Sequence, residues 1–335
     1  MGQSRKEVIH NIFNGKEADR IPVGFWFHFL EDEIHADAFR DPALDALRLK
    51  GQEEYIDRVR PDFVKIMTDG FFGYGNPALY HVQSASGIRD IQPLPEDHPW
   101  FTRQIAFARE LTEKYGEDLD FFYNLFCFGT TFAFMQEGDG EGFLARLIRE
   151  EPETVQRVSA VVSQDLGRLA QRLIQEAHVS GIYFSLRNIK GVERELYGQV
   201  IEPGERTVLQ RAHEAGGSQI LHICGYEGHR NDITWYKDYD FQAVNWAVDT
   251  EKITLGEGRR IFKGKTVMGG FGNTDKDVLY RGSREQVEEE TERIIREAGS
   301  QSLILGADCT VPRDIDIERF EWVREKAASL SERKE

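Results

Sequence analysis

Short apolar stretches alternate with amphipathic stretches along the whole chain. Eight of the apolar stretches have the length of strands and are rich in β-branched and aromatic residues. Their nearly continuous apolar character is typical of strands that are buried on both faces of a parallel sheet. The predicted strands are 21–26, 63–68, 120–126, 181–186, 218–224, 243–248, 266–271 and 302–308.

The stretches between these strands have apolar residues at three- and four-residue spacing, which predicts helices, most clearly over 152–177 and 283–298. Ser283 and Gln286 fit a capping box at the start of the second helix. Eight β-then-α units predict an α/β fold, a (β/α)8 TIM barrel that forms a single domain over residues 1–335. An open doubly wound sheet is the alternative, but no G-x-G-x-x-G follows the first strand.

Composition narrows the class of protein. A length of 335 residues suits one large barrel or two average domains. No apolar run approaches the roughly 20 residues that span a bilayer, and the N-terminal residues lack an apolar signal core. The net charge of −16 disfavours nucleic acid and anionic membranes as partners. We therefore expect a cytoplasmic protein that binds neither nucleic acid nor membranes.

Polar residues gather where the predicted strands end. In a barrel these positions converge on the carboxyl-end mouth, where such folds carry out their chemistry. From this set we assign Asp69 and Asn245 as candidate catalytic residues, although an aspartate at a strand end can equally cap a turn. The polar residues at strand ends are His28, Asp69, Cys127, Arg187, Asn188, His222, Cys224, Asn245, Asn273, Asp308 and Cys309.

A histidine and a cysteine two residues apart end the fifth strand. Residues i and i+2 face the same side of a strand, about 6.6 Å apart, so His222 and Cys224 can both reach one ion. Cys309 would return to the same mouth from the eighth strand. His, Cys and Cys with a vacant fourth position describe a catalytic zinc site. The alternative is a packed core histidine beside an inert thiol, which is also the expected role of Cys127.

Other residues near this strand end have two possible roles each. Glu227 and His229 could supply a fourth zinc ligand, or could face solvent on a loop. The aromatic run at 71–75 could cover a flat cofactor or pack in the core. We assign His28, Phe71 and Tyr74 as candidate cofactor-binding residues.

Five stretches in order carry a resemblance to a known family. The stretches "RIPVGFW", "LHICG", "VNWAVD", "VMGGFGNTD" and "LILGADCTVP" make the chain resemble the uroporphyrinogen decarboxylase superfamily over nearly its whole length. The resemblance implies a (β/α)8 barrel, in agreement with the strand count. It also implies one of two activities, because the superfamily contains porphyrinogen decarboxylases and zinc-dependent methyltransferases.

The chain is most similar to the methyltransferase branch, whose members resemble methylcobalamin:coenzyme M methyltransferase. The zinc signature of that branch maps onto His222, Cys224 and Cys309. Decarboxylases carry arginines after the first strand for substrate carboxylates, whereas this chain reads "FWFHFLEDEIH" and has no arginine there until Arg40. Asp69 stands near the position of the aspartate that contacts pyrrole nitrogens in the decarboxylases.

The resemblance implies methyl transfer between a corrinoid and a small thiol or methylated donor. Zinc in such a shell lets a substrate thiol bind and lose its proton at neutral pH. No Asp-x-His-x-x-Gly corrinoid stretch occurs in the 335 residues, so we expect the corrinoid to arrive on a separate protein. A tetrapyrrole decarboxylase and a non-catalytic corrinoid- or thiol-binding protein are the alternatives.

Overall fold

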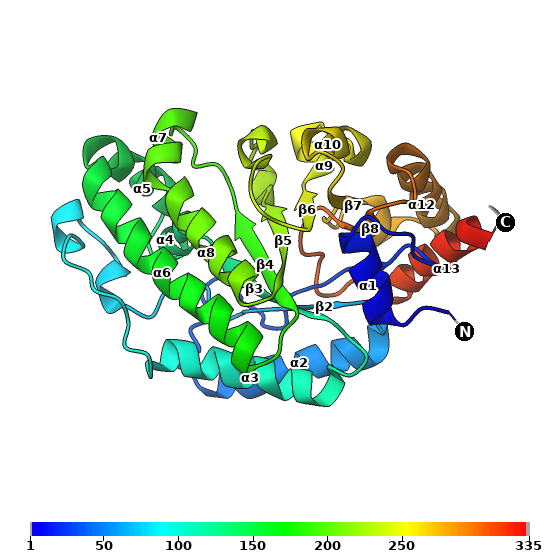
Figure 1. Ribbon diagram of the computed structural model, residues 1–335, viewed down its shortest axis with the longest axis horizontal. Helices are drawn as coiled ribbons and strands as arrows, with labels where there is room; N and C mark the ends of the chain where they lie inside the picture. Colours follow the sequence, from blue (N-terminus) through cyan, green and yellow to red (C-terminus); the bar gives the residue numbers. More distant parts are fainter. Residues whose placement is uncertain (1, 333–335) are drawn as a thin grey trace.

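The computed structural model describes residues 2–332, and these contain one eight-stranded parallel sheet. The strand order is β1-β8-β7-β6-β5-β4-β3-β2, so the first and last strands are neighbours and the sheet curls into a nearly closed barrel (Figure 1). The prediction of a (β/α)8 barrel is confirmed, and the open doubly wound alternative is wrong. The strands are β1 (Val23–Gly24), β2 (Val64–Ile66), β3 (Phe121–Phe126), β4 (Gly181–Leu186), β5 (Ser218–Ile223), β6 (Ala243–Trp246), β7 (Thr266–Phe271) and β8 (Leu303–Ala307).

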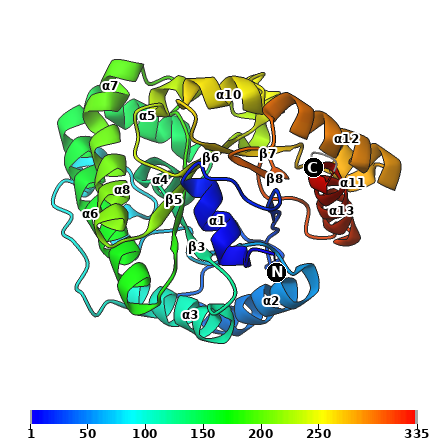
Figure 2. The same ribbon diagram turned by 45° about the vertical axis from the view of Figure 1, so that its right-hand side comes forward.

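Helices surround the sheet as an outer ring (Figure 2). The two helices with the clearest sequence pattern occur where they are predicted, and the Ser283 capping box is present. The helices of the ring are α2 (Ala43–Val59), α3 (Pro99–Tyr115), α4 (Phe128–Phe134), α5 (Gly140–Glu150), α6 (Pro152–Glu176), α7 (Arg194–Val200), α8 (Glu202–Glu214), α9 (Val248–Glu251), α10 (Leu255–Ile261), α11 (Val278–Arg281), α12 (Arg284–Ala298) and α13 (Glu318–Glu332).

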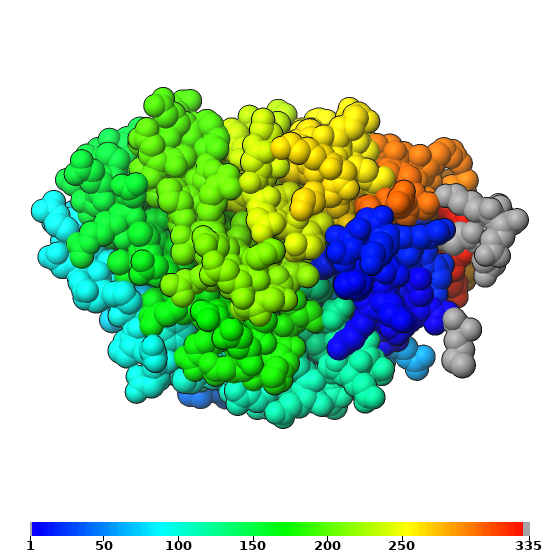
Figure 3. All heavy atoms as spheres, in the orientation of Figure 1, coloured from blue at the N-terminus to red at the C-terminus, as the bar shows by residue number. Residues whose placement is uncertain are grey.

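A further helix, α1 (Arg5–Phe13), closes the amino end of the barrel. Its apolar side chains Val8, Ile9 and Ile12 pack in one cluster with inward-facing residues of the strands. The Thr266 hydroxyl at the start of β7 donates to the Ile12 carbonyl at 2.7 Å. In Figure 2 the helix is drawn in front of the strands, and in Figure 3 the N-terminal residues, in blue, form part of the surface. This leaves the carboxyl ends of the strands as the open end.

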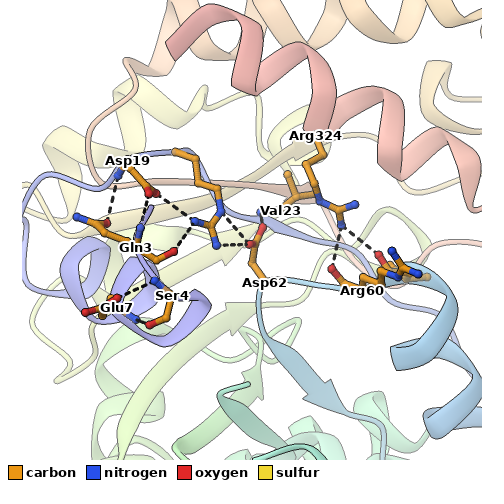
Figure 4. A network of polar contacts seen from close by, with 10 residues as sticks. Gln3, Ser4, Glu7, Asp19, Val23, Arg60, Asp62 and Arg324 are labelled. Atoms are coloured by element: carbon orange, nitrogen blue, oxygen red, sulfur yellow. Dashed lines mark hydrogen bonds and ion pairs between the residues drawn. The ribbon is translucent and has the colours of Figure 1, made fainter. Parts of the chain in front are cut away.

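Side chains, rather than a ladder of backbone hydrogen bonds, join β1 to β2 within residues 2–332. The Val23 N–H donates to the Asp62 carboxylate at 2.9 Å, and the Arg20 guanidinium contacts the same carboxylate at 3.2 Å (Figure 4). A Cβ on Gly24 would lie 2.5 Å from the Phe63 ring, so that ring occupies the space between the strands. We call this contact between β1 and β2, made by Arg20, Val23, Asp62 and Phe63, the seam of the barrel. The seam explains why β1 and β2 are shorter than the six residues that the sequence predicts for each.

No helix in the described part of the chain is both long enough and apolar enough to cross a bilayer.

Candidate metal centre

The His-x-Cys pair of the fifth strand lies at the carboxyl end of the barrel. His222 is 2% exposed and faces inward, in register with Asn245 on β6. β5 ends at Ile223, and the Cys224 N–H still donates to the Leu186 carbonyl of β4 at 2.8 Å. This hydrogen bond extends the regular geometry to Cys224 and keeps it on the same side as His222.

Cys309 reaches the same point from the end of β8. The Asp308 N–H donates to the Phe271 carbonyl of β7 at 2.8 Å, which holds the segment after β8 against the sheet. The Cys309 sulfur lies 3.5 Å from His222 Nε2, and one ligand atom from each of His222, Cys224 and Cys309 lies within 4.8 Å of the other two. One imidazole and two thiols at this separation match the donor set of a catalytic zinc site, whose metal–ligand distances are about 2.0–2.3 Å.

Asn245 lies behind His222 and orients its ring. The Asn245 Nδ2 group donates to the Met268 and Ala307 carbonyls at 2.9 and 3.1 Å, and these bonds fix the orientation of the amide. The Asn245 Oδ1 atom then accepts from His222 Nδ1 at 2.5 Å and from the Tyr183 hydroxyl at 3.0 Å. Because the proton of His222 is held on Nδ1, the lone pair on Nε2 faces the two cysteines and is available to a metal.

The two cysteines differ in acidity. A hydrogen bond between their sulfurs lowers the pKa of Cys309 well below its ordinary value and raises the pKa of Cys224 well above it. Contact with His222 and the nearby ammonium of Lys65 also favour the Cys309 thiolate. A thiolate is the form of cysteine that binds a metal, so one ligand is predisposed to binding.

A cavity of about 1810 Å³ opens above this group at the mouth of the barrel. Its inner end is formed by inward-facing strand residues, and its lining as a whole includes seven acidic and six basic side chains. The Ser185 hydroxyl donates to Asn124 Oδ1 at 3.0 Å, and Asn124 Nδ2 donates to the Thr68 hydroxyl at 3.1 Å. The residues at the inner end are Lys65, Met67, Asn124, Ser185, His222, Cys224 and Cys309.

His28 lines the cavity and forms a dyad with Asp69, which does not line it. Asp69 is fully buried, and its Oδ1 atom lies 2.7 Å from His28 Nδ1. The Phe29 and Leu30 N–H groups donate to Asp69 Oδ2 at 2.7 and 3.2 Å. Burial raises the pKa of Asp69, but the hydrogen bonds from His28 and the two N–H groups outweigh it, so the net pKa lies below the ordinary value. The dyad gives the cavity an oriented imidazole.

Phe71 and Tyr74 do not line the cavity. Phe71 packs against Phe39, and the Tyr74 hydroxyl donates to the buried Asp165 carboxylate at 2.5 Å. Neither of these two candidate cofactor-binding residues therefore faces the cavity. Phe72 is the ring of this run that lines the cavity, and it packs edge-on against His28 with 5.9 Å between ring centroids.

Glu227 and His229 both line the cavity, but neither belongs to the three-residue group that could hold a metal. Glu227 lies in a short 3-10 turn, Tyr226–Gly228. His229 Nδ1 lies 3.7 Å from the Glu141 carboxylate, and its Nε2 atom is buried without a hydrogen-bond partner in the described structure. Cys127 is buried at the start of α4 and stands apart from the metal group.

The sequence analysis missed Lys65, which lies at the inner end of the cavity. A signal for it exists, because a lysine in the middle of the apolar stretch "FVKIMT" shares its strand face with Phe63 and Met67. A charged residue in a strand that is otherwise buried needs a reason to be there.

Comparisons with known proteins agree with this architecture. Two of the solved structures that share the fold have low sequence identity to this chain. A methyltransferase from Methanosarcina mazei superposes with a TM-score of 0.73 at 11% identity, over 98% of this chain and 99% of that one. A B12-independent methionine synthase from Shewanella sp. W3-18-1, in complex with selenomethionine, superposes with a TM-score of 0.58 at 12% identity, over 94% and 96% of the two chains.

At the level of sequence, a search among curated proteins finds no match. The family model for uroporphyrinogen decarboxylase (URO-D), in contrast, matches residues 74–330. This range includes β3 to β8, and with them all three residues of the metal group. The chain therefore belongs to the uroporphyrinogen decarboxylase family.

Proposed function

We propose that this protein is a zinc-dependent methyltransferase that moves a methyl group between a corrinoid on a separate protein and a small thiol or methylated donor. The donor set of His222, Cys224 and Cys309 carries this proposal. Their ligand atoms lie within 4.8 Å of one another, at the inner end of a cavity that is open to solvent. The methyltransferase fold neighbour supports the reaction class.

The residues of the site have separate roles in this proposal. His222, Cys224 and Cys309 would hold the metal, and Asn245 keeps the Nδ1 proton of His222 away from it. When bound, zinc would supply a Lewis-acid position at which a thiol loses its proton at neutral pH. The dyad of His28 and Asp69 can accept or return that proton from the cavity wall.

The cavity is large for a small thiol alone. A volume of about 1810 Å³ exceeds the roughly 300–1,000 Å³ of a typical small-molecule site. A methyl donor carried by a second protein would need this additional space, because donor and acceptor must align for an in-line transfer. The methionine synthase neighbour is described as B12-independent, so methyl transfer without a corrinoid is the second candidate.

A tetrapyrrole decarboxylase is less well supported by the cavity. The seven acidic and six basic side chains that line it give no excess of positive charge for a polycarboxylate. Arg187, which is one of the basic groups, pairs with Glu141 at 2.6 Å. We expect no decarboxylation of uroporphyrinogen above the rate without enzyme.

The test is methyl exchange followed by the corrinoid spectrum. Zinc-loaded protein is incubated with methylcobalamin or cob(I)alamin and a panel of thiols and methylated donors, first alone and then with a candidate corrinoid protein. Methyltetrahydrofolate serves as the corrinoid-free donor. Cys309→Ala is expected to lose transfer, and Cys127→Ala, which removes a cysteine outside the metal group, is expected to keep it. Equal rates in these two variants would disprove the proposed role of the metal.

A further inference from the structure

Lys65 is a buried lysine whose ammonium group contacts no carboxylate. It lies in the middle of β2, is 5% exposed, and lines the cavity together with His222, Cys224 and Cys309. Within residues 2–332, no carboxylate lies within 4.0 Å of its ammonium group and no hydrogen bond involves it. Burying an unpaired charge is costly, so such a group is retained where a ligand completes it.

Aromatic faces hold the ammonium in place. Lys65 Nζ lies 4.2 Å from the centre of the Tyr183 ring and 5.2 Å from the Trp26 ring. Tyr183 also packs against His222 with 5.3 Å between ring centroids, so the ammonium and the ligand histidine share one aromatic neighbour. Aromatic faces attract a cation but carry no net charge, so they hold the ammonium group without neutralising it.

The neighbouring polar groups are already engaged. Asp69, the carboxylate whose charge acts on Lys65, contacts His28 and accepts from two backbone N–H groups. Asn124 and Ser185 bond to each other, and Asn124 also bonds to Thr68. Of the groups at the inner end of the cavity, the ammonium of Lys65 is thus the one cation positioned for an incoming anion.

Charge balance indicates which anion this is. A zinc ion with two thiolates and a neutral imidazole has no net charge, and a deprotonated substrate sulfur adds one negative charge. Lys65 can balance that charge across the inner end of the cavity, in a medium where an ion pair is worth more than in water. Burial lowers the pKa of Lys65 to about 8, and the charges of Cys309 and Cys224 oppose this effect.

We propose that Lys65 is a positioning residue that supplies the counter-charge for the anionic, deprotonated substrate at the metal centre. This inference rests on the proposed function, because it needs the three ligands to hold a metal and a thiol to bind there. It goes further by naming the group that stabilises the anionic substrate, a lysine on a different strand from the metal ligands.

The titratable groups around Lys65 come from several elements. Their protonation can contribute to any pH dependence, so they are the groups that the test must separate from Lys65. They are Asp69 after β2, Tyr183 on β4, His222 and Cys224 at the end of β5, and Cys309 after β8.

The test measures thiol binding rather than turnover. Cobalt(II)-substituted protein is titrated with 2-mercaptoethanol between pH 6 and 9, and the sulfur-to-cobalt absorption band reports binding. Lys65→Met and Lys65→Gln are compared with Lys190→Met, a control that removes an exposed lysine from the same cavity. We expect both Lys65 variants to bind the thiol about tenfold more weakly at pH 7, with the pH midpoint of binding raised by about one unit. Lys190→Met should match the wild type.

A second measurement separates function from folding. Since Lys65→Met removes an unpaired buried charge, its urea midpoint should equal or exceed that of the wild type, with one metal still bound per chain. A lower midpoint in both Lys65 variants, or a wild-type pH midpoint in them, would overturn the inference. If the wild-type protein binds no thiol, the proposed function fails as well, whereas equal binding by wild type and Lys65 variants refutes the role of Lys65 alone.

Discussion

Replacing Asn245 by alanine tests the support behind the metal centre. The side chain is fully buried and makes four hydrogen bonds, to His222, Tyr183, Met268 and Ala307. Asn245→Ala removes all four, so two donors and two carbonyls lose a partner. The change leaves the three proposed metal ligands in the chain.

The magnitudes follow from these contacts. A buried polar group without a partner costs about 1–3 kcal/mol. Water that enters the space left by the amide can satisfy part of the set, so we expect the free energy of unfolding of the apo-protein to fall by about 2–4 kcal/mol. Loss of the partner that orients a ligand histidine typically weakens metal binding 10- to 100-fold. We expect a loss of zinc affinity in this range.

The assay is zinc competition against a chromophoric chelator, together with urea unfolding of the metal-free protein. Asn124→Ala is the matched control, because Asn124 is another buried asparagine on an inward face and its hydrogen bonds go to Thr68 and Ser185. This control should lose stability and keep its zinc affinity. If Asn245→Ala and Asn124→Ala bind zinc equally well, Asn245 does not orient His222 for the metal.

Three further predictions concern the zinc content, a buried carboxyl group and the seam between β1 and β2. The protein as isolated should carry about one zinc per chain, and full zinc occupancy in the double variant Cys224→Ser, Cys309→Ser would contradict the ligand assignment. Glu205 is a carboxyl group on α8 that is 1% exposed, and burial raises its pKa to about 7 from an ordinary 4.5. The folded state therefore retains a proton that the unfolded state loses, and stability falls as pH rises from about 4.5 to 7. Glu205→Gln should remove this dependence, worth about 3 kcal/mol, in urea titrations at pH 5 and 8, and an unchanged slope would exclude Glu205 as its source. Asp62→Ala should lower the free energy of unfolding by about 1–3 kcal/mol because the Val23 N–H loses its partner, whereas the exposed control Asp57→Ala should change it by less than about 1 kcal/mol.

Most of the fold can be predicted from local patterns. All eight strands lie where short apolar stretches occur, because burial on both faces of a parallel sheet requires such stretches. The seam is the part that local pattern does not reveal. The stretch 21–26 has the composition of a full strand, but only Val23–Gly24 pair as one, since the Asp62 carboxylate and the Phe63 ring occupy the other side.

The sequence by itself determined which side of the sheet each strand residue faces, because side chains alternate strictly along a strand. That rule places His222 and Cys224 on the same face of their strand, and it could have placed Lys65 on an inward face. The tertiary structure decided which residues of different strands meet. Asn245 orients His222 because β5 and β6 pair in one particular register, and Phe72 rather than Phe71 reaches the cavity because of how the loop after β2 packs. These relations depend on strand register and barrel closure, which couple residues far apart in the chain and leave no local pattern in it.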